Sequence, residues 1–299
     1  WTSDGPDGSG QGIFGQRYDA TGATQGTEFQ INNYIIDGQK LSSVSALTDG
    51  GFVVTWTSEL QDGNSNGVFG QRFNATGTPQ GAEFQVNTYT ADEQSVTSVA
   101  GLQGGGFIVS WESFGQDGDG SGVYAQLYSA AGSPIGAEFR VNTETASFQQ
   151  LPSVTGLPDG GFVVTWQSLD QDASGYGVYG QRYEATGAAL GGEFQINTFT
   201  TGLQFQNSVS GLPGGGFVVT WTSDAQDGSG YGIFAQRFDA NSLSTGLLTI
   251  DGTVKEGEVL TAQTGAIADA DGLGAFTYSW LRDGVVIAGA DQPSYMLID

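Results

Sequence analysis

Cysteine and histidine are absent from this 299-residue chain, and it holds only 8 basic residues and 7 prolines. Without Cys or His there is no disulfide, no thiol nucleophile, no Ser-His-Asp triad and no zinc or haem site of the usual kinds. Oxygen-ligated metals, calcium above all, are the class that remains. Eight scattered cations against a net charge of −24 cannot neutralise a phosphate backbone, which excludes nucleic acid as a partner.

Long hydrophobic runs are also missing. No stretch of the sequence approaches the roughly 20 apolar residues that span a bilayer, so we expect a soluble chain without membrane insertion. Glycine, in contrast, is abundant at 50 residues, and only 13% of the chain is charged. The acidic, glycine-rich and cysteine-free composition predicts an extracellular or cell-surface location, where divalent cations are plentiful.

A repeat of 55 residues dominates the first four fifths of the chain. Four steps of this length pass without an insertion or a deletion. The period is carried by tryptophans at 1, 56, 111, 166 and 221, phenylalanines at 52, 107, 162 and 217, glutamines at 16, 71, 126, 181 and 236, and glutamates at 28, 83, 138 and 193.

Each repeat is predicted to form four short strands, typified by residues 95–99, 161–166, 177–183 and 193–197. Phe162, Val164 and Trp166 alternate with smaller residues, which is the period of a strand packed on a core. No segment has sustained helical periodicity, so the fold is predicted to be all-β. Tandem four-stranded units of this size are typical of β-propeller blades, and a linear β-solenoid is the alternative. We assign this repeat domain to residues 1–244.

The pattern stops after Ala240. Residues 247–299 contain short strands, Trp280 on a central strand and an Asp283-Gly284 hairpin turn, which predict a partial immunoglobulin-like sandwich. The chain also begins inside a repeat, because the segment that precedes Trp56 has no counterpart before Trp1. We therefore expect further repeat units upstream and a C-terminal module that is incomplete.

Residues 215–221 and 226–238 resemble tandem repeats of large secreted bacterial proteins of the haemolysin-type calcium-binding and type I-secreted adhesin class. Residues 257–262 and 279–284 are similar to the bacterial Ig-like modules of the same proteins. The resemblance implies an extracellular, calcium-dependent adhesive or matrix role without catalysis. The G-G-x-G-x-D nonapeptide of the calcium β-roll is absent, so that calcium chemistry does not carry over.

An acidic loop follows the second strand of every repeat. An Asp stands six residues after each Trp, an oxygen-bearing side chain follows two residues later, and a Gly closes the loop. In the third copy the order D-x-D-x-S-G is typical of a calcium loop, whereas Asp-Gly pairs that simply make tight turns are the alternative. The candidate calcium ligands are Asp117, Asp119 and Ser121, with Asp7, Ser9, Asp62, Asn64, Asp172, Ser174, Asp227 and Ser229 in the other copies.

Aromatic residues of the third strand, such as Tyr124 and Tyr179, are interpreted as packing between repeats, with stacking on sugars as the alternative. Tyr176 and Tyr231 differ, because they lie in the loops and are better placed to contact a sugar. The repeated arginines, such as Arg72 and Arg182, are predicted to pair with carboxylates, Glu28 and Glu83 being two candidates.

The sequence thus predicts a non-catalytic structural or adhesive protein of a bacterial surface, biofilm matrix or filament, stiffened by calcium. Its expected partners are neighbouring copies, other surface or matrix components, and glycans. A lectin-like carbohydrate-binding propeller is the alternative function. An enzyme is disfavoured because the acidic residues recur in every repeat, whereas an active site needs one repeat that departs from the others.

Overall fold

A computed structural model describes residues 1–5, 8–239, 248–265, 278–282 and 285–298. The chain divides into unit 1, Trp1–Arg237, and unit 2, Phe238–Asp299. The domain limits expected from the sequence, 244 and 247, lie outside the described residues. Within the described ranges, no helix has the length and apolar character that crossing a membrane requires.

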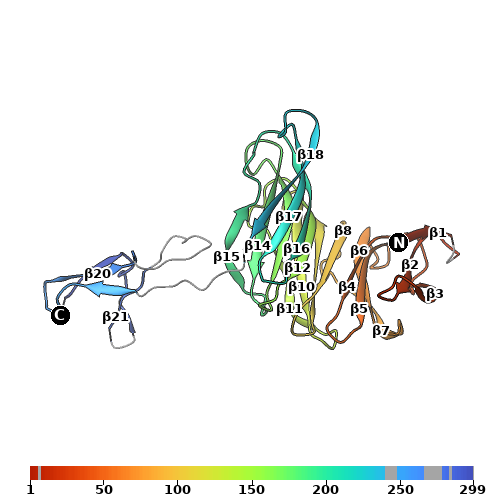
Figure 1. Cartoon of the computed structure of the whole chain (residues 1–299), viewed down its shortest axis with the longest axis horizontal. Helices are drawn as coiled ribbons and strands as arrows, with labels where there is room; N and C mark the ends of the chain where they lie inside the picture. The colour runs from red at the N-terminus through yellow and green to blue at the C-terminus, as the bar shows by residue number, and fades with distance from the viewer. Residues whose placement is uncertain (6–7, 240–247, 266–277, 283–284, 299) are drawn as a thin grey trace. The chain divides into compact units, whose positions relative to one another are not determined.

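Unit 1 is a series of antiparallel sheets that follow one another in chain order (Figure 1). Strands adjacent in sequence pair in every sheet. The complete sheets are β4 (Gln39–Ala46), β5 (Phe52–Glu59), β6 (Asn66–Phe73) and β7 (Pro79–Gln85); β8 (Gln94–Gly101), β9 (Phe107–Phe114), β10 (Ser121–Tyr128) and β11 (Pro134–Arg140); and β12 (Gln149–Gly156), β13 (Phe162–Leu169), β14 (Tyr176–Tyr183) and β15 (Ala189–Gln195). Three-stranded sheets flank them: β1 (Thr2–Asp4), β2 (Gln11–Tyr18) and β3 (Thr24–Gln30), and β16 (Gln204–Gly211), β17 (Phe217–Asp224) and β18 (Tyr231–Phe238). The predicted all-β fold of repeated four-stranded units is confirmed.

Neighbouring sheets pack through two different faces. In β13, the face that carries Phe162, Val164 and Trp166 packs on Val123 and Ala125 of the preceding sheet. The same face of the other repeats forms the equivalent clusters. Stacked aromatic pairs recur within these layers, such as Phe162 and Tyr183 with ring centroids 4.9 Å apart. The third-strand aromatics Tyr124 and Tyr179 are therefore core residues, as the sequence predicted, whereas Tyr18 of the first repeat is exposed.

The first strands of successive repeats, β4, β8, β12 and β16, lie next to one another. Each offers hydroxyl groups to the backbone of the next: Ser98 Oγ accepts from Val154 N at 3.1 Å, and Ser153 Oγ accepts from Val209 N at 3.2 Å. The approach is so close that a Cβ on Gly156 would stand 2.5 Å from the Gly101 carbonyl oxygen. This side-by-side arrangement of inner strands is consistent with propeller blades grouped around an axis.

A buried amide pair joins the link that follows the fourth strand of each repeat to the first strand of the next. Asn142 Oδ1 accepts from Val123 N at 2.7 Å, and its Nδ2 donates to Gln149 Oε1 at 3.1 Å. Gln149 Nε2 in turn donates to Ala146 O at 2.7 Å. The same pairing recurs at Asn32–Gln39, Asn87–Gln94 and Asn197–Gln204. Both partners are nearly excluded from solvent, so the network fixes the link between repeats.

The repeated Glu and Arg residues do not pair with each other as expected. Glu83 accepts from Asn33 N at 2.7 Å and from Gln61 Nε2 at 2.5 Å, and so ties its strand to the preceding repeat. Arg72 instead approaches Asp49 at 3.6 Å, and Arg182 has an equivalent pair. The choice of Glu83 as the Arg partner was wrong. The Asn33 backbone N–H and the Gln61 side-chain amide satisfy this carboxylate instead.

Unit 2 contains a three-stranded sheet and a two-stranded sheet. The first has the order β19 (Thr249–Asp251), β20 (Val259–Gln263) and β23 (Ser294–Met296), and the second pairs β21 (Leu281–Arg282) with β22 (Val285–Val286). The predicted Asp283-Gly284 turn lies outside the described residues, between β21 and β22. An immunoglobulin-like sandwich is not established by these five short strands.

Candidate functional site at the loop end of unit 1

The two ends of each sheet carry different connections. We call the end with the turn between first and second strands, such as the one that follows Ala46, the turn end. The loop end carries the acidic loop between second and third strands and the link to the next repeat. The sequence-predicted calcium ligands belong to the loop end. So do Tyr176 and Tyr231, but they are the first residues of β14 and β18 and not loop residues as predicted.

The aspartates of three acidic loops, Asp62, Asp172 and Asp227, accept hydrogen bonds from their own loop. Asp62 Oδ1 accepts from Asn64 N at 3.1 Å, and Asp172 Oδ1 accepts from Ser174 N at 3.2 Å. The carboxylate lies against the glycine that closes the loop: a Cβ on Gly67 would stand 2.6 Å from Asp62 Oδ2. These contacts are those of Asx turns and explain why Asp and Gly recur together. They leave calcium binding as a prediction.

The remaining candidate ligands are distributed around the loop end. Asp119 Oδ2 accepts from Ser147 N of the next repeat at 3.2 Å, and Ser174 Oγ accepts from Gly202 N at 3.1 Å. Ser121 is buried at the start of β10, and Asp117 Oδ1 is a buried oxygen without a hydrogen-bond partner. Asp7 lies outside the described residues. Among the residues that the structure describes, no three acidic side chains are grouped as a metal site.

Near the loop end, one pair of facing residues in the first and second strands differs from repeat to repeat. We call the position of this pair the loop-end level. A residue in the left-handed region, such as Val96 at φ 52°, directly follows this level in each inner strand and marks a register shift. Bulges of this kind re-aim side chains and are common beside functional sites. The four pairs at this level are Lys40 with Thr57, Ser95 with Glu112, Gln150 with Gln167, and Phe205 with Thr222.

Glu112 is the residue at this level that the sequence reasoning missed. Its Oε1 accepts from Gln150 Nε2 at 3.0 Å, and the carboxylate also accepts from the Ser121 hydroxyl and the Leu151 backbone N–H. Burial raises the pKa of Glu112, these three donors lower it, and the nearby negative charge of Glu93 raises it, with a net upward shift. No other repeat has an acid here: the equivalent residues are Thr2, Thr57, Gln167 and Thr222.

The raised pKa of Glu112 predicts that this residue lowers the stability of the folded protein at neutral pH. A carboxyl group that is harder to ionise in the folded state favours folding below its unfolded pKa, and this contribution is lost as the pH rises through the folded pKa. Glu112→Gln, which copies Gln167 of the next repeat, should therefore stabilise the protein at pH 7 relative to wild type. The difference should vanish near pH 3.5 in thermal melts. A variant that is less stable than wild type at pH 7 would show that the ionised carboxylate is needed.

Two tyrosines lie near the same level in the two repeats that follow the repeat of Glu112. The Tyr176 hydroxyl donates to Gln150 Oε1 at 2.9 Å, so Glu112, Gln150 and Tyr176 form one connected polar group. Burial raises the Tyr176 pKa, followed by the charges of Glu112 and Asp170, which keeps the phenol protonated. Tyr231 is 66% exposed and meets Phe205 edge-on at 5.6 Å. An exposed aromatic pair thus adjoins a partly buried polar group.

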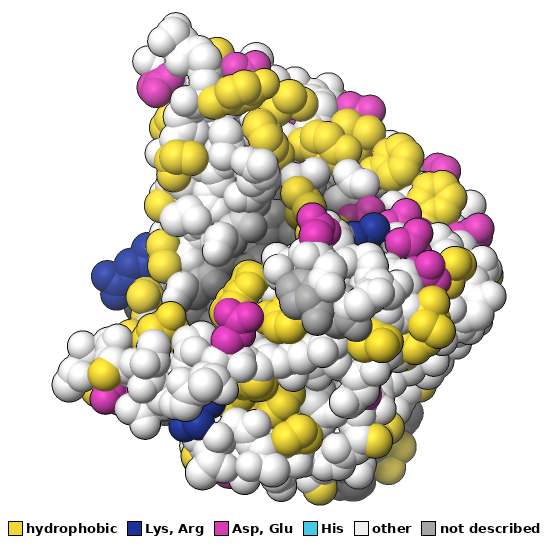
Figure 2. Space-filling view, turned by 90° about the vertical axis from the view of Figure 1, so that its right-hand side faces the viewer, with side chains coloured by type: hydrophobic (Ala, Val, Ile, Leu, Met, Phe, Trp, Pro, Cys, Tyr) yellow, Lys and Arg dark blue, Asp and Glu magenta, His cyan; other side chains and the backbone are white. Residues whose placement is uncertain are grey.

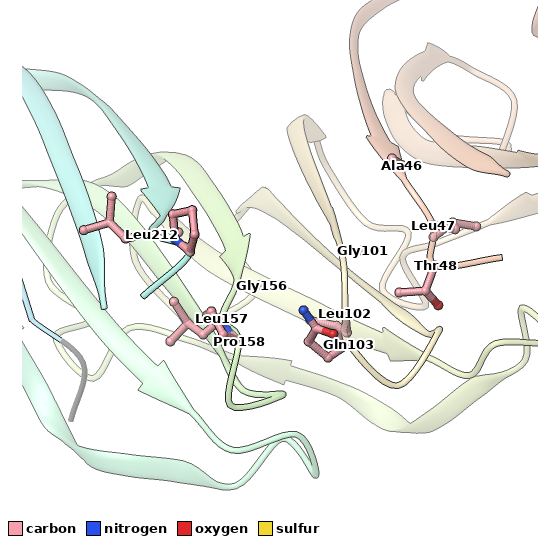
Figure 3. A pocket seen from close by; sticks show the side chains of 12 residues that line it. Ala46, Leu47, Thr48, Gly101, Leu102, Gln103, Gly156, Leu157, Pro158 and Leu212 are labelled. Atoms are coloured by element: carbon pink, nitrogen blue, oxygen red, sulfur yellow. The ribbon is translucent and has the colours of Figure 1, made fainter. Parts of the chain in front are cut away.

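The turn end carries a mostly apolar cavity (Figure 3). A cavity of about 380 Å³ lies where the four inner strands end, lined by equivalent residues such as Leu47, Leu102, Leu157 and Leu212. Its lining is mostly apolar side chains and glycine backbone, and it has no charged side chain. This cavity marks the region around which the repeats are grouped and offers no chemistry beyond apolar contact.

Comparison with known proteins finds no matching family model and no matching curated protein. Similar solved structures include an α-L-arabinofuranosidase from Fusarium graminearum, with 11% identity, 79% of this chain and 76% of that chain covered, and a TM-score of 0.47. An endo-arabinase from Bacteroides thetaiotaomicron has 12% identity, coverage of 72% and 82%, and a TM-score of 0.43. A microbial sialidase has 10% identity, coverage of 83% and 63%, and a TM-score of 0.46.

These findings correct three expectations. The similar structures are carbohydrate-active enzymes and not haemolysin-type calcium-binding adhesins, so the family resemblance and the structural or adhesive function that it implied are overturned. The prediction of a non-catalytic protein is corrected with them. Glu112 is an acid at which one repeat departs from the others, although its carboxylate accepts hydrogen bonds from Gln150, Ser121 and Leu151. At this level of similarity no residue role passes from those enzymes to this chain.

Proposed function

We propose that unit 1 binds carbohydrate at its loop end, around Tyr231, Phe205 and the Glu112–Gln150–Tyr176 group. The exposed Tyr231–Phe205 pair is the observation that supports this best. The apolar face of a sugar ring packs on an aromatic side chain, and its hydroxyls need donors and acceptors at fixed positions. Gln150 and Tyr176 provide such groups one repeat away, and Glu112, which bonds to Gln150, lies two repeats away.

The differences between repeats at this level support one specific site over several equivalent ones. Positions that hold the fold, such as Trp111 and Asn142, recur in all the complete repeats, whereas the loop-end level changes from Lys40 to Ser95, Gln150 and Phe205. A ligand without rotational symmetry needs contact groups that differ around it. The proposed ligand is therefore a single glycan segment that spans neighbouring repeats.

Tyr231→Ala tests the proposal. A glycan array and then titration calorimetry on the best hit should show a loss of affinity of roughly tenfold or more, which corresponds to about 1.4 kcal/mol. Tyr18→Ala is the matched control, because Tyr18 is also an exposed strand tyrosine but ends β2 at the turn end. Hits should also be assayed for released reducing ends. Cleavage by wild type that Glu112→Gln abolishes would assign a catalytic proton to Glu112.

Equal loss of affinity in the two tyrosine variants would contradict a loop-end site. Binding that survives in both would do the same. Because Tyr231 is a surface residue, its truncation should leave the melting temperature within a few degrees of wild type.

Calcium binding by the acidic loops remains a separate proposal. The third loop is the best candidate, because Asp117 keeps one unpartnered oxygen and Asp119 adds a second carboxylate. Millimolar calcium should then raise the melting temperature above that in EDTA or magnesium, through binding to the folded state alone. The double variant Asp117→Ala with Asp119→Ala should reduce this shift. A melting temperature that calcium leaves unchanged would establish these loops as turns only.

An extracellular location and an Ig-like identity for unit 2 are likewise proposals. The cysteine-free, acidic composition supports the first. The second is supported by Trp280, which precedes the β21–β22 hairpin and lies 5.9 Å from Tyr295 between ring centroids.

A further inference from the structure

The hydrogen bonds of the Glu112–Gln150–Tyr176 group have a direction that is fixed at the Glu112 end. The Glu112 carboxylate accepts from the Leu151 backbone N–H, a group that can only donate, and from the Ser121 hydroxyl. It also accepts from Gln150 Nε2 at 3.0 Å. Three donors around one carboxylate favour its ionised form, which offers acceptors only. The Gln150 amide must therefore turn its nitrogen toward Glu112 and its oxygen away.

The same direction continues to Tyr176. The Tyr176 hydroxyl donates to Gln150 Oε1 at 2.9 Å, so its single hydrogen is already used. What the phenol oxygen has left is a lone pair, which can only accept. Glu112, Gln150 and Tyr176 are each partly exposed, so a ligand at the loop end can reach this group. A sugar hydroxyl that donates a hydrogen bond fits the Tyr176 oxygen, and a group that only accepts does not.

The charges that act on this group are negative. Burial raises the pKa of both Glu112 and Tyr176, and so do nearby carboxylates: Glu93 for the first, Glu112 and Asp170 for the second. Lys40 is a cation at the loop-end level, but it lies on β4, and β8 packs between β4 and β12. On the face that Figure 2 shows, Asp and Glu side chains are more common than Lys and Arg side chains. A carboxylate or sulfate on a ligand would therefore stand beside charges of its own sign.

We propose that the loop-end site selects a neutral glycan, one hydroxyl of which donates a hydrogen bond to the Tyr176 oxygen, and that it rejects uronic-acid and sulfated glycans. This inference rests on the proposed function and narrows it to a class of ligand. Glu112 acts here as a positioning residue: it orients Gln150, which orients the Tyr176 hydroxyl. The site discriminates because a ligand that cannot donate leaves the Tyr176 oxygen unpaired.

A glycan array that pairs neutral oligosaccharides with their uronic-acid counterparts tests the effect of charge. Suitable pairs of equal length are fragments of mannan and polymannuronate, and of galactan and polygalacturonate. Within each pair that binds, titration calorimetry should show that the neutral member binds at least tenfold more tightly. Equal or tighter binding of the uronic member would overturn the proposal.

Monodeoxyfluoro derivatives of the best neutral hit test the direction of the hydrogen bond. Fluorine is close to a hydroxyl group in size but cannot donate. At one ring position this replacement should weaken binding to the wild-type protein at least tenfold. Tyr176→Phe should bind the parent sugar and that derivative equally, because the acceptor is gone. Tyr18→Phe is the matched control at the turn end and should keep the wild-type ratio of affinities.

Glu112→Gln separates positioning from a purely structural role. Gln167, the counterpart of Glu112 in the next repeat, accepts from the Gln206 backbone N–H at 3.1 Å, so a glutamine fits at this position. A glutamine can also donate to Gln150 Oε1, which lets the Gln150 amide turn over and donate to the Tyr176 oxygen. The Tyr176 hydroxyl can then donate to the ligand, and the preference for hydroxyl over fluorine should fall below about threefold. A folded variant that keeps the wild-type preference would overturn the positioning role.

Failure of this inference is distinguishable from failure of the loop-end site. No binding by any glycan, or equal loss of affinity in Tyr231→Ala and Tyr18→Ala, would contradict the site and the inference together. Binding that depends on Tyr231 but is indifferent to the charge of the sugar, or to fluorine at every ring position, would leave the site standing and overturn its selectivity.

Discussion

Trp166→Ala should lower the free energy of unfolding of unit 1 by about 3–5 kcal/mol. The indole is fully buried between β13 and the preceding sheet, and its truncation leaves a cavity that two rigid sheets cannot close. A loss of this size shifts the melting temperature by roughly 10 °C for a unit of this length. Urea denaturation followed by circular dichroism measures the effect directly.

Trp1→Ala is the matched control, because Trp1 occupies the same repeat position but is half exposed. Its cost should be below about 1 kcal/mol. Trp166→Phe adds a second control: it keeps an aromatic ring and removes an indole N–H that has no hydrogen-bond partner. Similar losses for Trp1→Ala and Trp166→Ala would contradict packing of the repeats through their tryptophan faces.

Asn142→Ala should cost about 3 kcal/mol, because it removes a hydrogen-bond partner from four groups that are buried or partly buried. These are Val123 N–H, Glu144 C=O, Gln149 Oε1 and Asp117 Oδ2, which lie 2.7, 2.6, 3.1 and 3.4 Å from the Asn142 amide. Asn142→Asp should be destabilising as well, since it keeps the acceptor but replaces the three donated bonds with a buried charge, one of whose neighbours is the Asp117 carboxylate. Chemical denaturation gives both values.

Asn64→Ala tests whether any loop asparagine would have the same effect. The Asn64 amide is exposed and accepts a single bond, from Ser65 N at 2.9 Å. Its removal should change the free energy of unfolding by less than about 1 kcal/mol. A cost for Asn142→Ala as small as that for Asn64→Ala would mean that water replaces the buried amide pair.

The exact 55-residue period made the fold accessible to sequence reasoning. The alternation of Phe162, Val164 and Trp166 with smaller residues predicts a strand and also predicts which of its faces packs on the core, because both follow from local periodicity. The Asn–Gln network was missed although Asn142 and Gln149 keep the same period. Polar residues in short strands are normally taken as solvent-facing, and only the packing of successive repeats shows that these amides are buried.

The candidate site was not predicted, because it depends on how the repeats differ and not on what they share. Averaging over repeats emphasises what they share, and so it directed attention to the recurrent Asp-Gly loops. Glu112 stands out only where the repeats are compared at one position and that position is known to be buried beside Gln150 of the next repeat. The sequence did single out Tyr176 and Tyr231, because loop aromatics have no core to fill. Their neighbours Gln150 and Phe205 come from a preceding strand, and pairing alone brings them together.

Hydrogen-exchange mass spectrometry with and without the best glycan hit tests the loop-end site most directly. The account predicts slower exchange in peptides that cover residues 148–151, 174–178, 203–207 and 229–233, where Gln150, Tyr176, Phe205 and Tyr231 lie. Peptides at the turn end, around Leu102 and Leu157, should be unchanged. Protection confined to the turn end, or no protection at saturating glycan, would contradict a carbohydrate site at the loop end.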